Sequence, residues 1–549
     1  MKRLAILLAV GLMGSVAGCA ANKASGARMP CPAGKLCLEW GNTSDPVSLD
    51  PHKTQGTWES RIVNDMLIGL TDNDAEGNVI PGMATSWETS PDGLVWTFHL
   101  REAKWSDGVP VTGEDFVYAL RRIMDPKTAA EYASLLYFIK NGEEVNAGDA
   151  PPTALGVESP DPRTVRITLK HPAPYILQLA KHQTMYPVPR HMVEKYGDKW
   201  TDPEHYVSNG PYKLVAWKLG DKVTIEKNPL YWEASTVCID RVNFYPTEDP
   251  GSAERQVRSG ELDYQGLRLN RIAYQKREAP EYVHTHIYLG NAYLPLNTGS
   301  AKLRDPRLRK ALSMVVDRDF LSHDVMLGIG MESAYNFVPP GIAGYPNPPE
   351  PEWAAWPMER RQQEARRLLA EAGYGPKNPL EIEIKQRSMD VTATQASVQN
   401  DWSKIGVKTT IITAETQIAY QYYRTGDFEV GDAGWIADYN DPMSFLYLMH
   451  SKTGAMNYGK YANPEYDRLL DLADNEPHPK KRGEILAQAE TVMMNDNPAI
   501  NLYFQIYGNL VSPRLTGYKD NISDTHPSRF MSFKDASCKA AGGDSTPTR

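Results

Sequence analysis

The chain has little cysteine and no excess of positive charge. Its 549 residues include five cysteines, and 59 lysines and arginines stand against 68 aspartates and glutamates, which gives a formal net charge of −9. An acidic surface does not attract phosphate backbones, and no basic run with interleaved aromatic residues occurs, so we expect no nucleic-acid partner. The sequence also lacks Gly-x-Ser-x-Gly, His-Glu-x-x-His and a glycine-rich phosphate loop. Because hydrolases and nucleotide enzymes depend on such motifs, we expect neither an enzyme nor a bound cofactor.

Two stretches begin like metal sites, and neither completes one. Residues 72–77 resemble the start of an EF-hand loop, but the twelfth position is Met83, which cannot supply the closing carboxylate. His284 and His286 fall on one face of a predicted strand, yet two imidazoles without a third ligand are weak grounds for a metal site. We therefore expect no bound metal.

Only one long apolar run occurs, and it lies at the start of the chain. A basic head, Met1-Lys2-Arg3, precedes a predominantly apolar run at residues 4–16, and small residues then lead to Cys19. At 1.5 Å per residue the run spans about 20 Å, short of the roughly 30 Å hydrocarbon core of a bilayer. Residues 1–18 resemble a bacterial lipoprotein signal, which implies cleavage before Cys19, lipidation of that cysteine and a periplasmic, membrane-anchored protein. An ordinary signal peptide without lipid is the alternative.

The 531 residues that remain after residues 1–18 exceed what one hydrophobic core accommodates, so two or three domains are expected. Residues 19–30 are small and polar, which is typical of a flexible tether. Residues 537–549 have the same character and predict a polar tail.

With Cys19 lipidated, four cysteines are left, and an even number in an exported chain predicts two disulfides. Four cysteines allow three pairings, among which the sequence alone does not choose. We favour Cys31 with Cys37, across a short loop, and Cys238 with Cys538, which would join the tail to the body. A zinc site is disfavoured because no further Cys-x-x-Cys or histidine pair completes four ligands.

Helices and strands are predicted along the whole chain. Apolar residues recur at helical spacing at 116–122, 306–321, 358–372, 392–404 and 464–495. Strand-like runs occur at 95–100, 164–169, 223–227, 242–245, 380–385 and 408–412. Asp305-Pro306 predicts a helix start and Gly373 a helix end. Because the two kinds of element are interspersed, an α/β protein with mixed sheets follows.

Residues 87–100 predict a β-hairpin with its turn at Pro91-Asp92-Gly93. Shortly afterwards, Thr112 and Asp115 have the spacing of a capping box at the start of a helix. Taken separately, these are folding devices and carry no chemistry.

Taken as a string, residues 87–116 are the first of six blocks that together resemble a known family. The other five are Ser48-Leu49-Asp50-Pro51-His52-Lys53, Ser208-Asn209-Gly210-Pro211-Tyr212-Lys213, Asn228-Pro229-Leu230-Tyr231-Trp232, Asp305-Pro306-Arg307-Leu308-Arg309-Lys310-Ala311 and Ala437-Asp438-Tyr439-Asn440-Asp441-Pro442. Their order over residues 38–533 resembles the oligopeptide-binding proteins of bacterial ABC importers, in the extracellular solute-binding protein family 5. The resemblance implies a periplasmic-binding-protein fold with two lobes, an extra domain and hinge closure over the ligand.

The resemblance also implies domain boundaries and partners. Lobe I is expected at 31–67, 188–289 and 506–536, the extra domain at 68–187 and lobe II at 290–505. The expected partners are an oligopeptide ligand, the transmembrane subunits of an ABC permease and, through the lipid, a membrane. The protein itself is expected to be a monomer.

Site residues are carried over by position. Asp438 matches the aspartate that pairs with the α-ammonium group of the peptide, where a carboxylate suits because a buried ammonium needs a hydrogen-bonded counter-charge. Trp435 and Tyr132 match aromatic residues that line the site, and Tyr439 adjoins the aspartate. Gln55 stands where related peptide binders often carry glutamate. Pairing of the peptide backbone with residues around 430–440 is expected to give sequence-tolerant affinity.

Two positions depart from the family pattern. Asp432 and Asp390 stand where relatives often carry the arginine and histidine that hold the carboxyl terminus of the peptide. Because two carboxylates repel each other, short free-acid peptides bound as in those relatives are not expected. The alternative is that Asp432 faces solvent or pairs with Arg424.

A disulfide found in some relatives is also missing. It joins the first strand of the second lobe to the aspartate loop, and Gly290 and Ile436 occupy its two positions here.

The sequence thus predicts a lipid-anchored receptor that captures peptides and passes them to a permease. Within the same fold, cell-wall peptides, haem, metal complexes and oligosaccharides are alternative ligands. A secreted hydrolase or chaperone is the alternative of another class.

Overall fold

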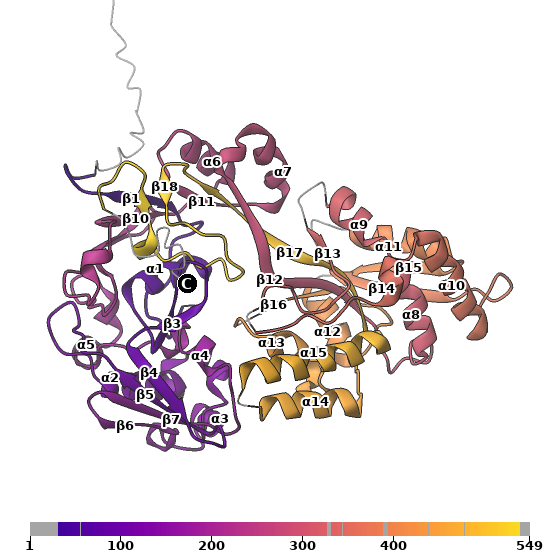
Figure 1. Ribbon diagram of the computed structural model, residues 1–549, viewed down its shortest axis with the longest axis horizontal. Coiled ribbons are helices and arrows are strands. Elements are labelled where there is room, and N and C mark those ends of the chain that lie inside the picture. The colour runs from indigo at the N-terminus through magenta and orange to yellow at the C-terminus, as the bar shows by residue number, and fades with distance from the viewer. Residues whose placement is uncertain are drawn as a thin grey trace, which may run out of the picture. The chain divides into compact units, whose positions relative to one another are not determined.

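The computed structural model describes residues 31–54, 56–326, 331–342, 344–387, 393–414, 416–437, 439–476 and 478–538, and it is drawn in Figure 1. The chain divides into a unit that ends at Lys35 and a unit that begins at Leu36. All described helices and strands belong to the second unit. The predicted signal, Cys19 and the tether lie outside the described residues. Among the helices that are described, none combines the length and apolar character that crossing a membrane requires.

In the described part of the chain, nine strands form one mixed sheet in the order β16-β12-β17-β11-β1-β10-β9-β8, with β13 beside β17. The strands are β1 (Cys37–Gly41), β8 (Tyr212–Lys218), β9 (Lys222–Lys227), β10 (Arg241–Tyr245), β11 (Tyr264–Leu267), β12 (Val283–Pro295), β13 (Glu332–Ser333), β16 (Ala433–Ile436) and β17 (Ala499–Val511). β1 runs parallel to β10 and β11, whereas the other neighbours are antiparallel. Alternation puts Leu38 and Trp40 of β1 in the core, where Trp40 stacks on Tyr264 with ring centroids 4.0 Å apart.

β12 and β17 are the two long strands that connect the two halves of the sheet, as Figure 1 shows. Their pairing runs from Val283↔Leu510, where β17 also pairs with β11, to Pro295↔Ala499, beyond the point where β12 pairs with β16. The register shifts between Ile287 and Asn291, where four steps along β12 oppose two along β17. The register shifts again between Ala292 and Tyr293. Extra residues of this kind weaken the ladder and bend a strand, so the pairing of the two strands is irregular at both places.

A separate four-stranded sheet follows the order β4-β5-β7-β6, with β4 (Ala84–Thr89), β5 (Val95–Leu100), β6 (Val157–Asp161) and β7 (Thr164–Thr168). The predicted hairpin is confirmed, since β4 pairs with β5 and Gly93 has φ 70°, which suits glycine in a turn. α2 (Gly113–Met124) packs on β6 and β7. The predicted capping box contributes at its start, because the Asp115 carboxylate accepts from the Thr112 backbone N–H at 2.8 Å.

Elsewhere, β14 (Glu381–Arg387) and β15 (Lys408–Ala414) pair in parallel. The helices of this half of the chain are α8 (Pro306–Met314), α9 (Arg318–Phe320), α10 (Met358–Glu371), α11 (Ala393–Ser403), α12 (Thr416–Thr425), α13 (Met443–Leu446), α14 (Pro464–Asp474) and α15 (Pro479–Asp496). The remaining elements are α1 (Thr57–Met66), α3 (Gly142–Ala147), α4 (Ile176–Leu179), α5 (Arg190–Tyr196), α6 (Pro250–Arg258), α7 (Leu269–Glu278), β2 (Thr71–Asn73), β3 (Val79–Pro81), β18 (Leu515–Thr516) and β19 (Ser532–Phe533). The α/β class with mixed sheets is confirmed.

Two helix predictions are wrong in extent. The run at 306–321 ends at Met314, and Asp317 caps the short α9 by accepting from the Phe320 backbone N–H at 3.0 Å. The run at 464–495 is two helices, α14 and α15, and Pro479 opens the second, where its missing N–H costs nothing. Apolar periodicity continues through the second break because α14 and α15 pack on the same core.

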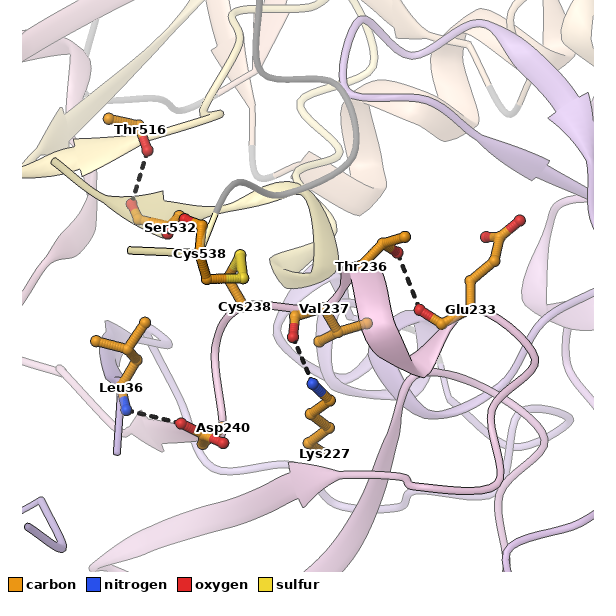
Figure 2. Close-up of a disulfide and its surroundings, with 10 residues drawn as sticks. All are labelled: Leu36, Lys227, Glu233, Thr236, Val237, Cys238, Asp240, Thr516, Ser532 and Cys538. Carbon is orange, nitrogen blue, oxygen red and sulfur yellow. Dashed lines mark hydrogen bonds between the residues drawn. A yellow bond between two sulfur atoms is a disulfide. The ribbon is translucent and has the colours of Figure 1, made fainter. Parts of the chain in front are cut away.

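The predicted bond between Cys238 and Cys538 is confirmed (Figure 2), and it joins residues 300 positions apart. Its two Cα atoms are 5.6 Å apart. Cys31 and Cys37 are also disulfide-bonded. All four cysteines that were expected to be oxidised are therefore oxidised.

Candidate functional site

A cavity of about 970 Å³ lies between two separate parts of the second unit. One wall comes from residues 134–179, around the four-stranded sheet, and the other from residues 435–475. Each wall contributes three Phe, Tyr or Trp side chains, which are Tyr137, Phe138 and Tyr175 on one wall and Trp435, Tyr439 and Tyr447 on the other. A cavity of this size and lining is typical of sites for small organic ligands.

Two of the predicted site residues, Trp435 and Tyr439, line this cavity. Trp435 lies on β16, and its indole N–H donates to the Ser444 hydroxyl at 3.3 Å. The Tyr439 ring stacks on the Tyr175 ring with centroids 4.8 Å apart, so the stack joins the two walls. Tyr439 also lines a smaller cavity of about 180 Å³, together with Ala437.

Of the other predicted residues, Tyr132 contacts His182, with ring centroids 6.2 Å apart, and His182 lines the smaller cavity. Gln55, Asp390 and Asp438 lie outside the described residues. The structure therefore brings Trp435 and Tyr439 together and places Tyr132 near them.

β16 is an edge strand, because in the described chain it pairs with β12 and has no strand on its other side. Gly434 and Ile436 on this strand are exposed, and Trp435 between them lines the larger cavity. An edge strand offers unpaired backbone N–H and C=O groups to any extended chain that enters. Gly290 and Ile436 are register partners in β12 and β16, so the two positions carried over from the missing disulfide do face each other.

The loop after β16 is anchored by a buried ion pair. Arg482 on α15 donates to both carboxylate oxygens of Asp441 at 2.6 and 2.9 Å, and both side chains are almost fully buried. Asp441 also accepts from the Met443 backbone N–H at 2.9 Å. The guanidinium lies 5.9 Å from the Tyr175 ring centroid, below the stack with Tyr439. Such a bidentate pair holds the loop in one position.

Asp432 has a partner that the sequence did not suggest. Arg387, at the end of β14, lies 3.3 Å from its carboxylate, and Arg387 also donates to the Tyr420 hydroxyl at 2.9 Å. Although burial opposes it, Asp432 raises the pKa of the Arg387 guanidinium. The alternative that Asp432 faces solvent or pairs with Arg424 is wrong. An arginine at the carboxyl end of a predicted strand was the available signal, but only the fold brings these positions together.

The two strand histidines face carboxylates. His284 lies 3.2 Å from Asp520, and His286 lies 3.6 Å from Asp520 and 3.6 Å from Asp524. Within the described ranges, no group of three or more histidine, cysteine and acidic side chains has a geometry that could hold a metal ion.

The comparisons with known proteins identify the family. The chain belongs to the bacterial extracellular solute-binding proteins, family 5, since the model described as family 5 Middle matches residues 78–457. It is 38% identical to the periplasmic oligopeptide-binding protein OppA of Salmonella typhimurium over 96% of this chain and 98% of that one. The fold with two lobes and an extra domain, predicted from the resemblance, is confirmed by these relatives.

Two solved structures differ in how well they match. The murein tripeptide-binding protein MppA in its unliganded open form superposes with a TM-score of 0.86, at 33% identity over 91% of this chain and 98% of that one. OppA of Haemophilus influenzae in complex with the peptide RPPGFSPFR superposes with a TM-score of 0.69, at 34% identity over 91% and 99%. Identity and coverage are nearly equal for the two structures, and the TM-score is higher for the unliganded open form of MppA.

Proposed function

We propose that this protein is a lipid-anchored substrate-binding protein that captures oligopeptides in the periplasm and delivers them to an ABC permease. The observation that carries the proposal is the free edge of β16 beside the aromatic cavity, because an extended peptide can add to such an edge through its backbone. The relatives support the proposal, since OppA is an oligopeptide-binding protein and one OppA structure holds a nine-residue peptide.

In this proposal, Asp438 pairs with the α-ammonium group of the peptide. Its chain neighbours Ala437 and Tyr439 both line the smaller cavity, which supports a position at the ligand. Trp435 and Tyr132 supply apolar surface, and Gln55 supplies a neutral hydrogen-bonding side chain. The ammonium is thus a ligand charge for which the proposed site has a dedicated partner.

The carboxyl end of the peptide meets acidic residues in this proposal. Asp432 and Asp390 stand at the positions proposed for that end, and the Asp432 charge is already compensated by Arg387. A free peptide carboxylate would therefore have to compete with Asp432 for the same guanidinium. We propose that peptides whose carboxyl terminus is amidated, or extends beyond this point, bind better than short free-acid peptides.

The proposed domain boundaries place lobe I at 31–67, 188–289 and 506–536, the extra domain at 68–187 and lobe II at 290–505. The change of lobe at 289/290 and 505/506 coincides with the register shift between Ile287 and Asn291 on β12. Crossing strands that are irregular at this point suit a hinge whose closure traps ligand.

Calorimetric titration with matched peptides tests the proposal. Free, N-acetylated and C-amidated forms of one tetrapeptide are titrated into the protein and into the variant Asp438→Asn. Acetylation of the peptide and the substitution Asp438→Asn should each weaken binding by about 2–5 kcal/mol, because a buried ammonium or carboxylate loses its partner. Asp198→Asn, an exposed aspartate whose side chain is 86% accessible, is the control and should leave affinity unchanged.

Equal affinity for all three peptide forms would contradict the proposed roles of Asp438 and the carboxyl-end residues. No binding of any peptide would reject the oligopeptide ligand itself. Mass spectrometry of ligands that co-purify would then identify the other ligand class.

A further inference from the structure

The charges around the larger cavity are paired, with one exception. Glu143 lies 3.2 Å from Lys170, and Asp471 lies 3.2 Å from Lys452, so these two rim carboxylates have cationic partners. Asp474 lines the same cavity, and its Oδ1 atom is buried without a hydrogen-bond partner among the described residues. One carboxylate of the cavity is therefore left uncompensated.

The surroundings of Asp474 disfavour its negative charge. It is the last residue of α14, where the free carbonyl groups of the helix carry partial negative charge. Burial raises the pKa of its carboxyl group to about 6, against the opposing effect of Arg482 and His171. Arg482 donates two hydrogen bonds to Asp441, while its buried Nε atom and the Asp474 Oδ1 atom both lack a hydrogen-bond partner among the described residues.

Three tyrosines line the same cavity as this carboxylate, namely Tyr175, Tyr439 and Tyr447. Burial raises the pKa values of these tyrosines, and the charge of Asp474 raises them further. The faces of aromatic rings carry negative potential and attract cations. A carboxylate oxygen without a hydrogen-bond donor, in a cavity that tyrosine rings also line, is suited to bind a cation.

We propose that Asp474 and these three tyrosines form a subsite for the cationic side chain of a bound peptide, either a lysine ammonium or an arginine guanidinium. This inference rests on the proposed function, because the peptide backbone must bring the side chain to the cavity. Trp435 and Tyr439 link the two sites, since both belong to the proposed peptide site and both line this cavity. The side chain that reaches Asp474 therefore belongs to a residue near the amino end of the peptide.

The subsite has a defined pH dependence. Above about pH 6 the Asp474 carboxyl group is ionised and attracts the cation, whereas below that pH it is protonated and does not. Asp441, Asp471, Arg482, His171 and the three tyrosines interact with it electrostatically. Glu143, Lys170, His450 and Lys452 line the same cavity. His171→Gln is the control for the histidine that acts electrostatically on Asp474.

The test uses alanine tetrapeptides that carry a single lysine at each position in turn, with norleucine as the uncharged match. At pH 7.5 one lysine position near the amino end should bind about tenfold more tightly than its norleucine match. Asp474→Asn should reduce this ratio to about twofold or less, and the ratio should fall between pH 7.5 and pH 5 in the unchanged protein and in His171→Gln. Asp471→Asn, whose carboxylate pairs with Lys452, is the matched control and should keep the preference.

The outcomes separate the subsite from the proposed function. If the alanine peptide binds but no lysine position is preferred, or the preference survives Asp474→Asn, the subsite is rejected and the peptide receptor stands. If no tetrapeptide binds, the proposed function fails and the subsite fails with it.

Discussion

Removing the Cys238–Cys538 disulfide should lower the free energy of unfolding substantially. The two cysteines are 300 positions apart, so the bond closes most of the chain into one loop. In the chain-entropy relation, a loop of this length gives about 5–6 kcal/mol, and measured losses on removing native disulfides are about 2–5 kcal/mol. We therefore expect the variant with both Cys238→Ala and Cys538→Ala to lose about 3–5 kcal/mol.

The structure around the bond indicates which side is released (Figure 2). The Cys238 side is fixed independently, because the Lys227 ammonium donates to the Val237 carbonyl at 2.7 Å and the Leu36 N–H donates to Asp240 at 2.9 Å. The Cys538 carbonyl accepts one hydrogen bond, from the Ser532 hydroxyl at 3.1 Å. Without the bond, the C-terminal segment should therefore detach first, and the body around Cys238 should keep its structure.

Urea denaturation of the oxidised protein and of the double alanine variant measures the loss. The slope of the free energy against urea should rise in the variant, because an unfolded chain without the crosslink exposes more surface. The variant with Cys31→Ala and Cys37→Ala is the comparison, and if those two cysteines bond to each other across a short loop, its loss should be about 2 kcal/mol. A loss below about 1 kcal/mol for Cys238→Ala with Cys538→Ala would refute the argument from chain entropy.

Two further predictions concern a buried carboxyl group and the membrane anchor. Glu490 accepts the backbone N–H groups of Phe337 and Val338 at 2.6 and 2.9 Å, and burial raises its pKa to about 7. Because this folded-state pKa lies above the ordinary value of 4.5, protonated Glu490 stabilises the folded state fully below about pH 4.5, and about 3 kcal/mol of this stabilisation is lost as the pH rises through about 7. Glu490→Gln should therefore flatten the dependence of the free energy of unfolding on pH. An unchanged pH dependence in this variant would contradict the argument. Cys19→Ala should give a protein that folds but leaves the detergent phase in detergent partitioning, and full retention there would contradict lipidation at Cys19.

Local features of the fold were predictable from the sequence, because each depends on residues a few positions apart. The hairpin at Pro91-Asp92-Gly93 and the interaction of Asp115 with Thr112 are of this kind. The division of the run at 464–495 into two helices was missed, because both helices pack on one core and the periodicity does not report the break. The spacing of apolar residues does not predict helix boundaries that depend on tertiary packing.

The charges of the site were harder to predict, because ion pairs form between positions that only the fold brings together. Arg387 and Asp432 are 45 residues apart, and Arg482 and Asp441 are 41 apart. From the sequence, Arg424 was the natural partner for Asp432 because it is near in the chain. Asp474 gave no signal at all, since a missing partner becomes visible only when every neighbouring charge has been assigned to another group.

Contacts between the two walls of the cavity also bear on closure of the protein. Tyr175 and Tyr439 stand on opposite walls, and their stack contributes about 0.5–1.5 kcal/mol to holding the walls together before any ligand is present. A ligand shifts the equilibrium between open and closed forms only by its difference in affinity for the two. A group that touches one wall alone contributes nothing to that difference, whereas a cation between Asp474 and Tyr175 would touch both.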